Sequence, residues 1–178
     1  VGLRTREGLA ARALEFAILC ASRSGEVRGA LWTEINWEDA IWTIPAERMK
    51  AGKEHRVPLS TPAVKLLEAL QRSGNSDLVF AGSNGKPLSD MALTAVMRRM
   101  EVDAVPHGFR STFRDWAGDC TNYPRDVAEF ALAHKVSDKV EAAYRRSDAL
   151  EKRRRMMEDW ANFCSTFPPL EPVIEGNT

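Results

Sequence analysis

The sequence predicts a mainly α-helical domain with one small three-stranded antiparallel β-sheet. Over most of the chain, apolar residues recur three and four positions apart, which is the spacing of one helix face. Between residues 34 and 59, apolar and polar residues alternate instead, which is typical of strands. The 178 residues are enough to bury a sizeable core, and they contain no internal repeat or interdomain linker.

The first half of the chain is expected to hold the sheet and three helices. A stripe that includes Leu9, Phe16 and Cys20 predicts the first helix, and the segment 24–26 breaks the chain after it. The polar loop before the third strand places Lys50 at or near the tip of a β-ribbon. In order, we expect a helix at 7–22 with Thr5 as its candidate cap, a short helix around 27–31, strands at 34–37, 41–44 and 55–59, and a helix from Thr61.

The second half is expected to be helical, with Ser and Asp residues at helix starts because their side chains accept hydrogen bonds from the free N–H groups there. We expect a loop at 73–87, then helices at 89–101, 107–119, 124–132, 137–146 and 148–164. Residues 165–178 lack a helix signal and are expected to form a flexible C-terminal tail or interaction arm. The domain is therefore expected to span residues 1–164.

Composition argues against several classes of protein. No apolar run approaches the roughly 20 residues that span a membrane, and residues 1–9 lack the apolar core of a signal peptide. Cys20, Cys120 and Cys164 have no CxxC spacing, so we expect buried small residues in a reducing cytoplasm rather than disulfides or a zinc site. The net charge of zero counts against nucleic-acid binding. However, residues 145–155 hold six basic residues against two acidic ones.

Two segments carry residues suited to an anionic substrate. His107 and Arg110 are three positions apart, so at a helix start they would point the same way beside free backbone N–H groups, which suits a phosphate. Arg23 leaves a buried helix at a tight turn, where Glu26 could pair with a neighbouring Arg and hold it in place. Taken singly, each feature has an ordinary structural interpretation, such as a capping His beside a surface Arg.

A third segment contains His134 and, ten residues later, Tyr144. One unbroken helix would separate them by about 15 Å along its axis, too far to serve one phosphate. The Ser137-Asp138 pair breaks the segment, so the chain can turn and bring them together. An ordinary half-buried Tyr is the alternative.

Together and in this order, these segments resemble the catalytic domain of tyrosine recombinases, the phage integrase family. SRSGEVRGALWTEINW is similar to the first arginine box, HGFRSTFRDWA to the second, and ALAHKVSDKVEAAYRRSD to the third, while RMKAGKEHRVPLS is similar to the turn that carries a catalytic Lys. The resemblance covers residues 8–164 and is closest to prophage and genomic-island integrases, in which DNA-binding domains precede this one. It implies the tyrosine recombinase fold and the catalytic residues Arg23, Lys50, His107, Arg110, His134 and Tyr144, with Glu26 as the acidic partner of Arg23.

The resemblance implies transesterification at a DNA phosphodiester, without metal or cofactor, through a 3′-phosphotyrosine on Tyr144. Arg23 and Arg110 would neutralise the non-bridging oxygens. His107 would accept or relay the Tyr144 proton, His134 would hydrogen-bond the phosphate, and Lys50 would protonate the departing 5′-oxygen. The implied DNA contacts are Arg23, Lys50, Lys53, Arg110 and Arg114.

Several assignments stay open. Tyr123 is the rival nucleophile, and Lys53 is the rival to Lys50. We expect His55 to be an exposed strand residue rather than a DNA contact, and Arg114 to contact either a phosphate or an acidic neighbour. Trp32, Trp37, Trp42 and Trp116 are expected in packing. The stripe Met156, Met157, Trp160 and Phe163 either packs on its own domain or docks on a neighbouring protomer.

The expected function is site-specific recombination of a mobile element on double-stranded DNA, by four protomers in contact, with the helix 148–164 as a candidate contact. One alternative is relaxation of supercoils in the manner of a type IB topoisomerase, which needs a single protomer. The other is a non-catalytic DNA-binding or assembly module.

Overall fold

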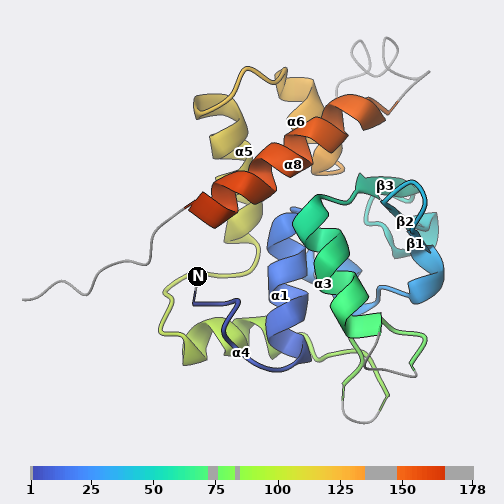
Figure 1. Ribbon diagram of the computed structural model, residues 1–178, viewed down its shortest axis with the longest axis vertical. Helices are drawn as coiled ribbons and strands as arrows, with labels where there is room; N and C mark the ends of the chain where they lie inside the picture. The colour runs from blue at the N-terminus through green and yellow to red at the C-terminus, as the bar shows by residue number, and fades with distance from the viewer. Residues whose placement is uncertain (1, 72–75, 83–84, 135–147, 167–178) are drawn as a thin grey trace, which may run out of the picture.

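The computed structural model describes residues 2–71, 76–82, 85–134 and 148–166. Figure 1 shows helices packed around a central α1, with the sheet at one side. The elements are α1 (Leu9–Leu19), α2 (Ser24–Arg28), η1 (Trp32–Glu34), β1 (Ile35–Asn36), β2 (Ile41–Ile44), η2 (Ala46–Arg48), β3 (His55–Pro58), α3 (Thr61–Gln71), α4 (Ala92–Arg99), α5 (Gly108–Asp119), α6 (Arg125–Ala131) and α8 (Leu150–Thr166).

The predicted fold class is confirmed, including the three antiparallel strands in the order β1-β2-β3. Ile35 pairs with Trp42, and Trp42 in turn pairs with Val57, so these three buried side chains lie in register on one face of the sheet. The connection from β2 to β3 carries Lys50, and it turns at Gly52, which has a φ of 63°. The ribbon and the place of Lys50 in it therefore agree with the prediction.

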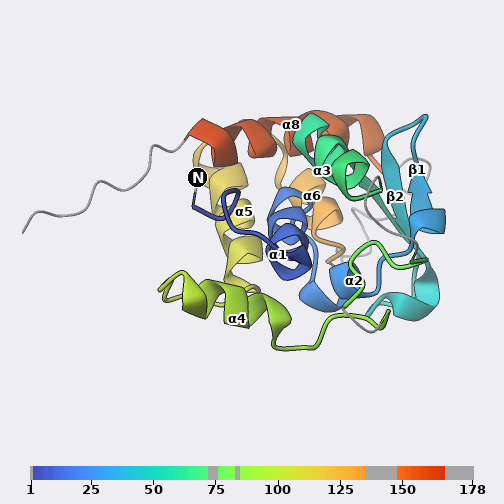
Figure 2. The same cartoon turned by 60° about the horizontal axis from the view of Figure 1, so that its bottom comes forward.

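The first core forms where α1 meets the sheet, α3 and α4. The Phe16 ring of α1 is fully buried, with its centroid 5.3 Å from the Trp42 ring and 5.5 Å from the Phe80 ring. These tilted contacts are favourable aromatic geometries. α1 is thus a central helix, covered on several sides (Figure 2), and it ends at the turn that leads to Arg23.

A second core joins α5, α6 and α8. The Trp160 ring meets Phe113 edge-on at 5.3 Å and lies 5.2 Å from Trp116, while its N–H donates to the Ile18 carbonyl of α1. Met156 and Met157 are also fully buried here. Own-domain packing is therefore confirmed for this stripe of α8. Met156, Met157 and Trp160 are therefore not free to dock on a neighbouring protomer, whereas Phe163 is only partly buried, and docking through it stays a prediction.

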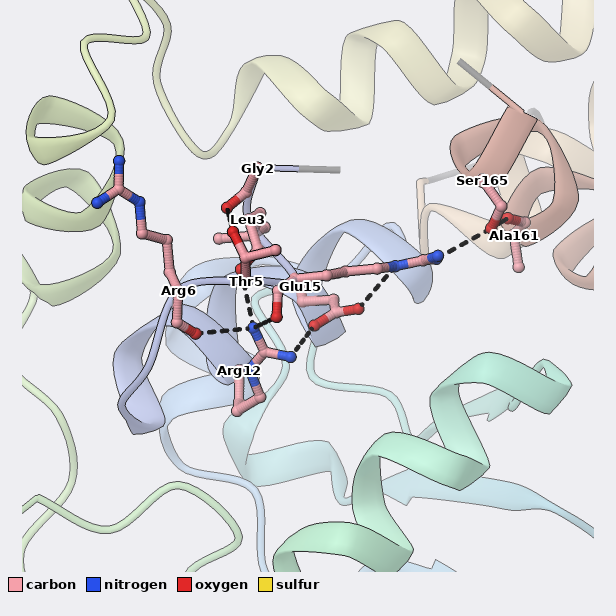
Figure 3. Close-up of polar contacts among 9 residues, drawn as sticks. Gly2, Leu3, Thr5, Arg6, Arg12, Glu15, Ala161 and Ser165 are labelled. Carbon is pink, nitrogen blue, oxygen red and sulfur yellow. Dashed lines mark hydrogen bonds and ion pairs between the residues drawn. The ribbon is translucent and has the colours of Figure 1, made fainter. Parts of the chain in front are cut away.

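The N-terminal segment is tied to α1 and α8 by arginine side chains (Figure 3). Arg12 donates to the carbonyls of Leu3, Arg4 and Arg6 at 2.8–3.1 Å and pairs with Glu15 at 2.7 Å. Arg4 also pairs with Glu15, and it donates to Ser165 at the end of α8. The start of the described chain is thereby held against both helices.

A few local predictions differ from the structure. Thr5 does not cap the first helix, because its hydroxyl donates to the Gly2 carbonyl and Gly8 holds the cap position. The helix expected from residue 89 begins at Ala92, and the last helix runs to Thr166. Cys20 is buried, as expected, but Cys120 is exposed. The predicted helix 137–146 and most of the predicted tail lie outside the described residues.

Candidate active site

A pocket of about 350 Å³ opens where α1 leads into α2, beside the β2–β3 connection. Three of the six predicted catalytic residues line it, namely Arg23, Lys50 and His107. They come from three segments spread over more than eighty positions of the chain, so only the tertiary fold brings them together. Lys50 and His107 are exposed, which leaves both side chains accessible to a ligand.

Glu26 fixes Arg23 from two sides. Its carboxylate accepts from the Arg23 backbone N–H at 2.8 Å and pairs with the Arg23 guanidinium at 2.7 Å. Glu26 is 5% exposed, and its charge is compensated by this pair. The expected pairing of Glu26 with Arg23 is thus present in the structure, and its role in catalysis stays a prediction. The Arg23 side chain remains 26% exposed, so it still faces the pocket.

Arg110 lies in the first turn of α5 and is almost completely buried. Its two terminal nitrogens donate to the carbonyls of Ala21 and Leu132, at 2.5 and 2.6 Å. Burial and the nearby Arg23 cation lower its pKa to about 10, so it stays charged near neutral pH. Its Nε is buried without a hydrogen-bond partner in the part of the chain described here. The structure thus holds a second positive charge near Arg23, by hydrogen bonds to two backbone carbonyls.

His134 approaches Arg110 from the end of α6. Its Nε2 lies 3.4 Å from Arg110 Nη2, while Nδ1 lies 2.6 Å from the Glu129 carboxylate. Glu129 fixes the orientation of the imidazole ring, because the carboxylate binds the ring nitrogen that faces away from Arg110. Arg114 also pairs with Glu129, at 2.9 Å. Of the two alternatives for Arg114, the structure thus shows the acidic neighbour. Its contact with DNA, like that of Lys53, stays a prediction.

Arg48 also lines the pocket, although no motif in the sequence indicates it. Its guanidinium pairs with Glu34 at 2.9 Å and donates to the Glu26 carbonyl at 3.3 Å. A Cβ on Gly29 would lie 2.5 Å from Arg48 Nη1, so a residue without a side chain leaves room for this arginine. Through these contacts Arg48 links α2, which carries Glu26, to the β-ribbon.

Tyr144 lies outside the described residues, but its rival Tyr123 is described. The Tyr123 hydroxyl donates to Asp159 at 2.6 Å, and burial together with this carboxylate raises its pKa to about 12. Ten residues of helix, about 15 Å, separate Arg110 from Cys120, and Tyr123 follows after that. A phenol that is hard to ionise and lies beyond the far end of α5 is a poor candidate nucleophile.

The prediction for His55 is wrong. The side chain is half-buried rather than exposed, and Nε2 lies 3.2 Å from the Ala131 carbonyl, so it donates as the neutral Nε2–H tautomer. Burial, and secondarily the Arg153 cation, lowers the pKa of His55 to about 4. No local sequence pattern announces this contact, because its partner is 76 positions away.

His55 predicts a loss of stability in acid. The unfolded chain, with an ordinary His pKa of about 6.5, binds a proton more readily than the folded chain. The free energy of unfolding should therefore fall from about pH 6.5 down to about pH 4, by on the order of 2 kcal/mol from this group. Urea unfolding across this range should show a smaller fall for His55→Gln. An equal fall in both proteins would contradict the assignment.

The basic run at 145–155 is in part structural. Arg153 is 1% exposed, and Arg154 donates to the Asp39 carbonyl in the β1–β2 turn. Net charge over this run is therefore a poor measure of a DNA-binding surface.

Within the described part of the chain, no group of three His, Cys, Asp or Glu residues could hold a metal ion. In the same residues, no helix is long and apolar enough to cross a membrane.

The family model described as "Phage integrase family" matches residues 5–151, which is most of the chain. The chain belongs to the phage integrase family. Among curated relatives, it is 39% identical over 169 residues to Prophage integrase IntZ of Escherichia coli (strain K12), covering 90% of this chain and 42% of that protein. It is 34% identical over 171 residues to the Integrase of Enterobacteria phage P4, covering 85% of this chain and 39% of that protein. The chain thus spans about two fifths of these integrases.

Solved structures of this family share the fold. The lambda integrase catalytic core is similar with a TM-score of 0.55 and 19% identity, covering 74% of this chain and 82% of that one. A lambda integrase tetramer bound to a Holliday junction is similar with a TM-score of 0.56 and 19% identity, covering 76% and 43%. The recombinase fold predicted from the sequence is confirmed by this likeness.

Proposed function

We propose that this chain is the catalytic part of a site-specific DNA recombinase that cleaves and rejoins DNA through a 3′-phosphotyrosine on Tyr144. The observation that carries the proposal is the convergence of Arg23, Lys50 and His107 on one pocket, with the Arg110 cation near Arg23. Such a set binds one phosphodiester and supplies both charge and proton transfer. Membership of the phage integrase family supports the same activity.

The proposed chemistry follows from the ordinary pKa of a phenol, near 10, which makes Tyr a poor nucleophile at neutral pH. Arg23 and Arg110 neutralise the charge that builds up on the non-bridging oxygens. His107 takes or relays the Tyr144 proton, His134 hydrogen-bonds the phosphate, and Lys50 protonates the departing 5′-oxygen. One P–O bond forms as another breaks, so rejoining needs no ATP. Because these two guanidiniums stabilise the negative charge of the transition state, we propose a reaction without a metal ion.

We propose double-stranded DNA and further copies of the chain as partners, in the cytoplasm. Lambda integrase has been solved as a dimer on a core site and as a tetramer on a Holliday junction, which supports assembly on DNA. Because the Met156, Met157 and Trp160 stripe is buried, any contact made by α8 uses its remaining surface.

The test is covalent attachment to a nicked duplex, in which loss of a short 5′-hydroxyl fragment prevents rejoining. We expect a DNA–protein adduct that survives denaturation and forms equally fast in excess EDTA. Strict dependence on magnesium would contradict the metal-free reaction, and binding without any adduct would favour a non-catalytic module. Relaxation of supercoiled DNA at low protein concentration, without recombination, would favour the topoisomerase-like alternative.

A further inference from the structure

Two arginines converge on Asp148, the first described residue after 134. Arg56 of β3 reaches the Asp148 carboxylate through Nε at 2.9 Å and Nη2 at 2.8 Å. Arg153 of α8 reaches the same oxygen at 2.8 Å and the Asp148 carbonyl at 2.7 Å. One carboxylate is therefore held by two cations, from two elements.

Arg153 uses its remaining terminal nitrogen to tie this cluster to β3, because Nη1 donates to the Arg56 carbonyl at 2.6 Å. A guanidinium that is 1% exposed is costly unless it is paired and hydrogen-bonded. Among the described residues, the hydrogen-bond and ion-pair partners of that guanidinium belong to Asp148 and Arg56. The cluster Arg56–Asp148–Arg153 is thus a closed network that fixes residue 148 against β3.

The place of Asp148 in the chain gives this network a consequence. Tyr144 precedes it by four residues, which span at most about 14 Å even when fully extended. Tyr144 follows His134 by ten residues, which span up to about 36 Å. The anchor at residue 148 therefore limits the position of Tyr144 much more tightly than the anchor at His134.

Strand β3 also contacts the segment after α6 that supports Arg110. His55, next to Arg56 on β3, donates to the Ala131 carbonyl, and the adjacent Leu132 carbonyl accepts from Arg110. β3 thus connects the cluster at Asp148 to the support of Arg110 (elements in Figure 1).

We infer that Arg56, Asp148 and Arg153 are positioning residues, which set the distance between Tyr144 and the Arg23–Arg110 pocket. The inference rests on the proposed function. None of the three contacts the reacting atoms; they act through the backbone that leads back to Tyr144. Because a small displacement of a nucleophile costs much of its rate, loosening the cluster slows cleavage.

Arg56→Gln and Asp148→Asn test this together, with single-turnover adduct formation measured at saturating nicked DNA. Both variants keep the backbone carbonyls that accept from Arg153. We expect each to lower the rate on the order of tenfold, and the double variant to lower it no further than the slower single one, because both break one network. Arg154→Gln is the matched control, since Arg154 also joins α8 to the sheet region but does not contact Asp148. It should retain the parental rate.

DNA affinity and thermal unfolding separate this role from its alternatives. A DNA-contact role would weaken binding in Arg56→Gln and strengthen it in Asp148→Asn, without a shared loss of rate at saturation. A purely structural role would lower the unfolding temperature and be relieved at low temperature. Either pattern, or parental rates in both variants, would overturn the inference. If the parent itself forms no adduct, the proposed function fails instead.

Discussion

Tyr144→Phe is expected to abolish covalent attachment to nicked DNA while leaving the fold and DNA binding unchanged. The substitution removes only the hydroxyl oxygen that would form the phosphotyrosine, and no other group in the proposed mechanism can replace it. Adduct yield on a denaturing gel measures the effect, and the DNA dissociation constant and the unfolding temperature confirm an intact protein.

Tyr123→Phe is the matched control for this experiment, because it makes the same change at the other tyrosine of the chain. It removes a hydrogen bond to Asp159 but should leave the adduct yield at the parental level. An adduct that persists in Tyr144→Phe and disappears in Tyr123→Phe would reverse the assignment.

Arg23→Gln should slow adduct formation on the order of 10²-fold or more, by analogy with the loss of an oxyanion donor. Glutamine keeps a hydrogen-bond donor but removes the positive charge that would meet the developing charge on the phosphate. The Glu26 carboxylate would then lose its cationic partner, although it keeps the Arg23 backbone N–H. The rate should therefore be measured at saturating DNA, beside the unfolding temperature.

Arg28→Gln controls for the loss of a positive charge, because Arg28 ends the short helix α2 that Arg23 precedes. Arg28 pairs with Asp90 and donates to the Leu88 carbonyl, and it does not line the pocket. Arg28→Gln should at most lower the stability of the protein and should leave the rate of adduct formation at the parental level. Equal slowing by both substitutions would mean that overall charge, rather than a contact of Arg23 with the phosphate, sets the rate.

The sequence predicts well those features that are local or fixed by motif order. Alternation between residues 34 and 59 gives the ribbon with Lys50 in its connection, and the spacing of Arg23 and Glu26 gives their ion pair. In both cases the interacting groups are close in sequence, so a short pattern contains the whole interaction.

The supports of the site are much less visible in the sequence. Arg110 is held by the carbonyls of Ala21 and Leu132, and backbone carbonyls are the same in every residue type. Nothing in the local pattern can therefore indicate which carbonyl an arginine will meet.

The contacts of His55 and Arg153 could not be predicted for the same reason. Each looks like a surface residue in its own segment, and each contacts an element far away in the chain. The charge count over the basic run 145–155 overstates the charge on the protein surface, because the Arg153 side chain is buried.

The most direct test of the account is a structure of the chain trapped covalently on nicked DNA. We predict a bond from the Tyr144 oxygen to the 3′-phosphate, with the Arg23 and Arg110 guanidiniums within hydrogen-bond distance of its non-bridging oxygens and Lys50 near the vacated 5′ position. A phosphate bonded to another residue, or bound away from Arg23 and Arg110, would contradict it.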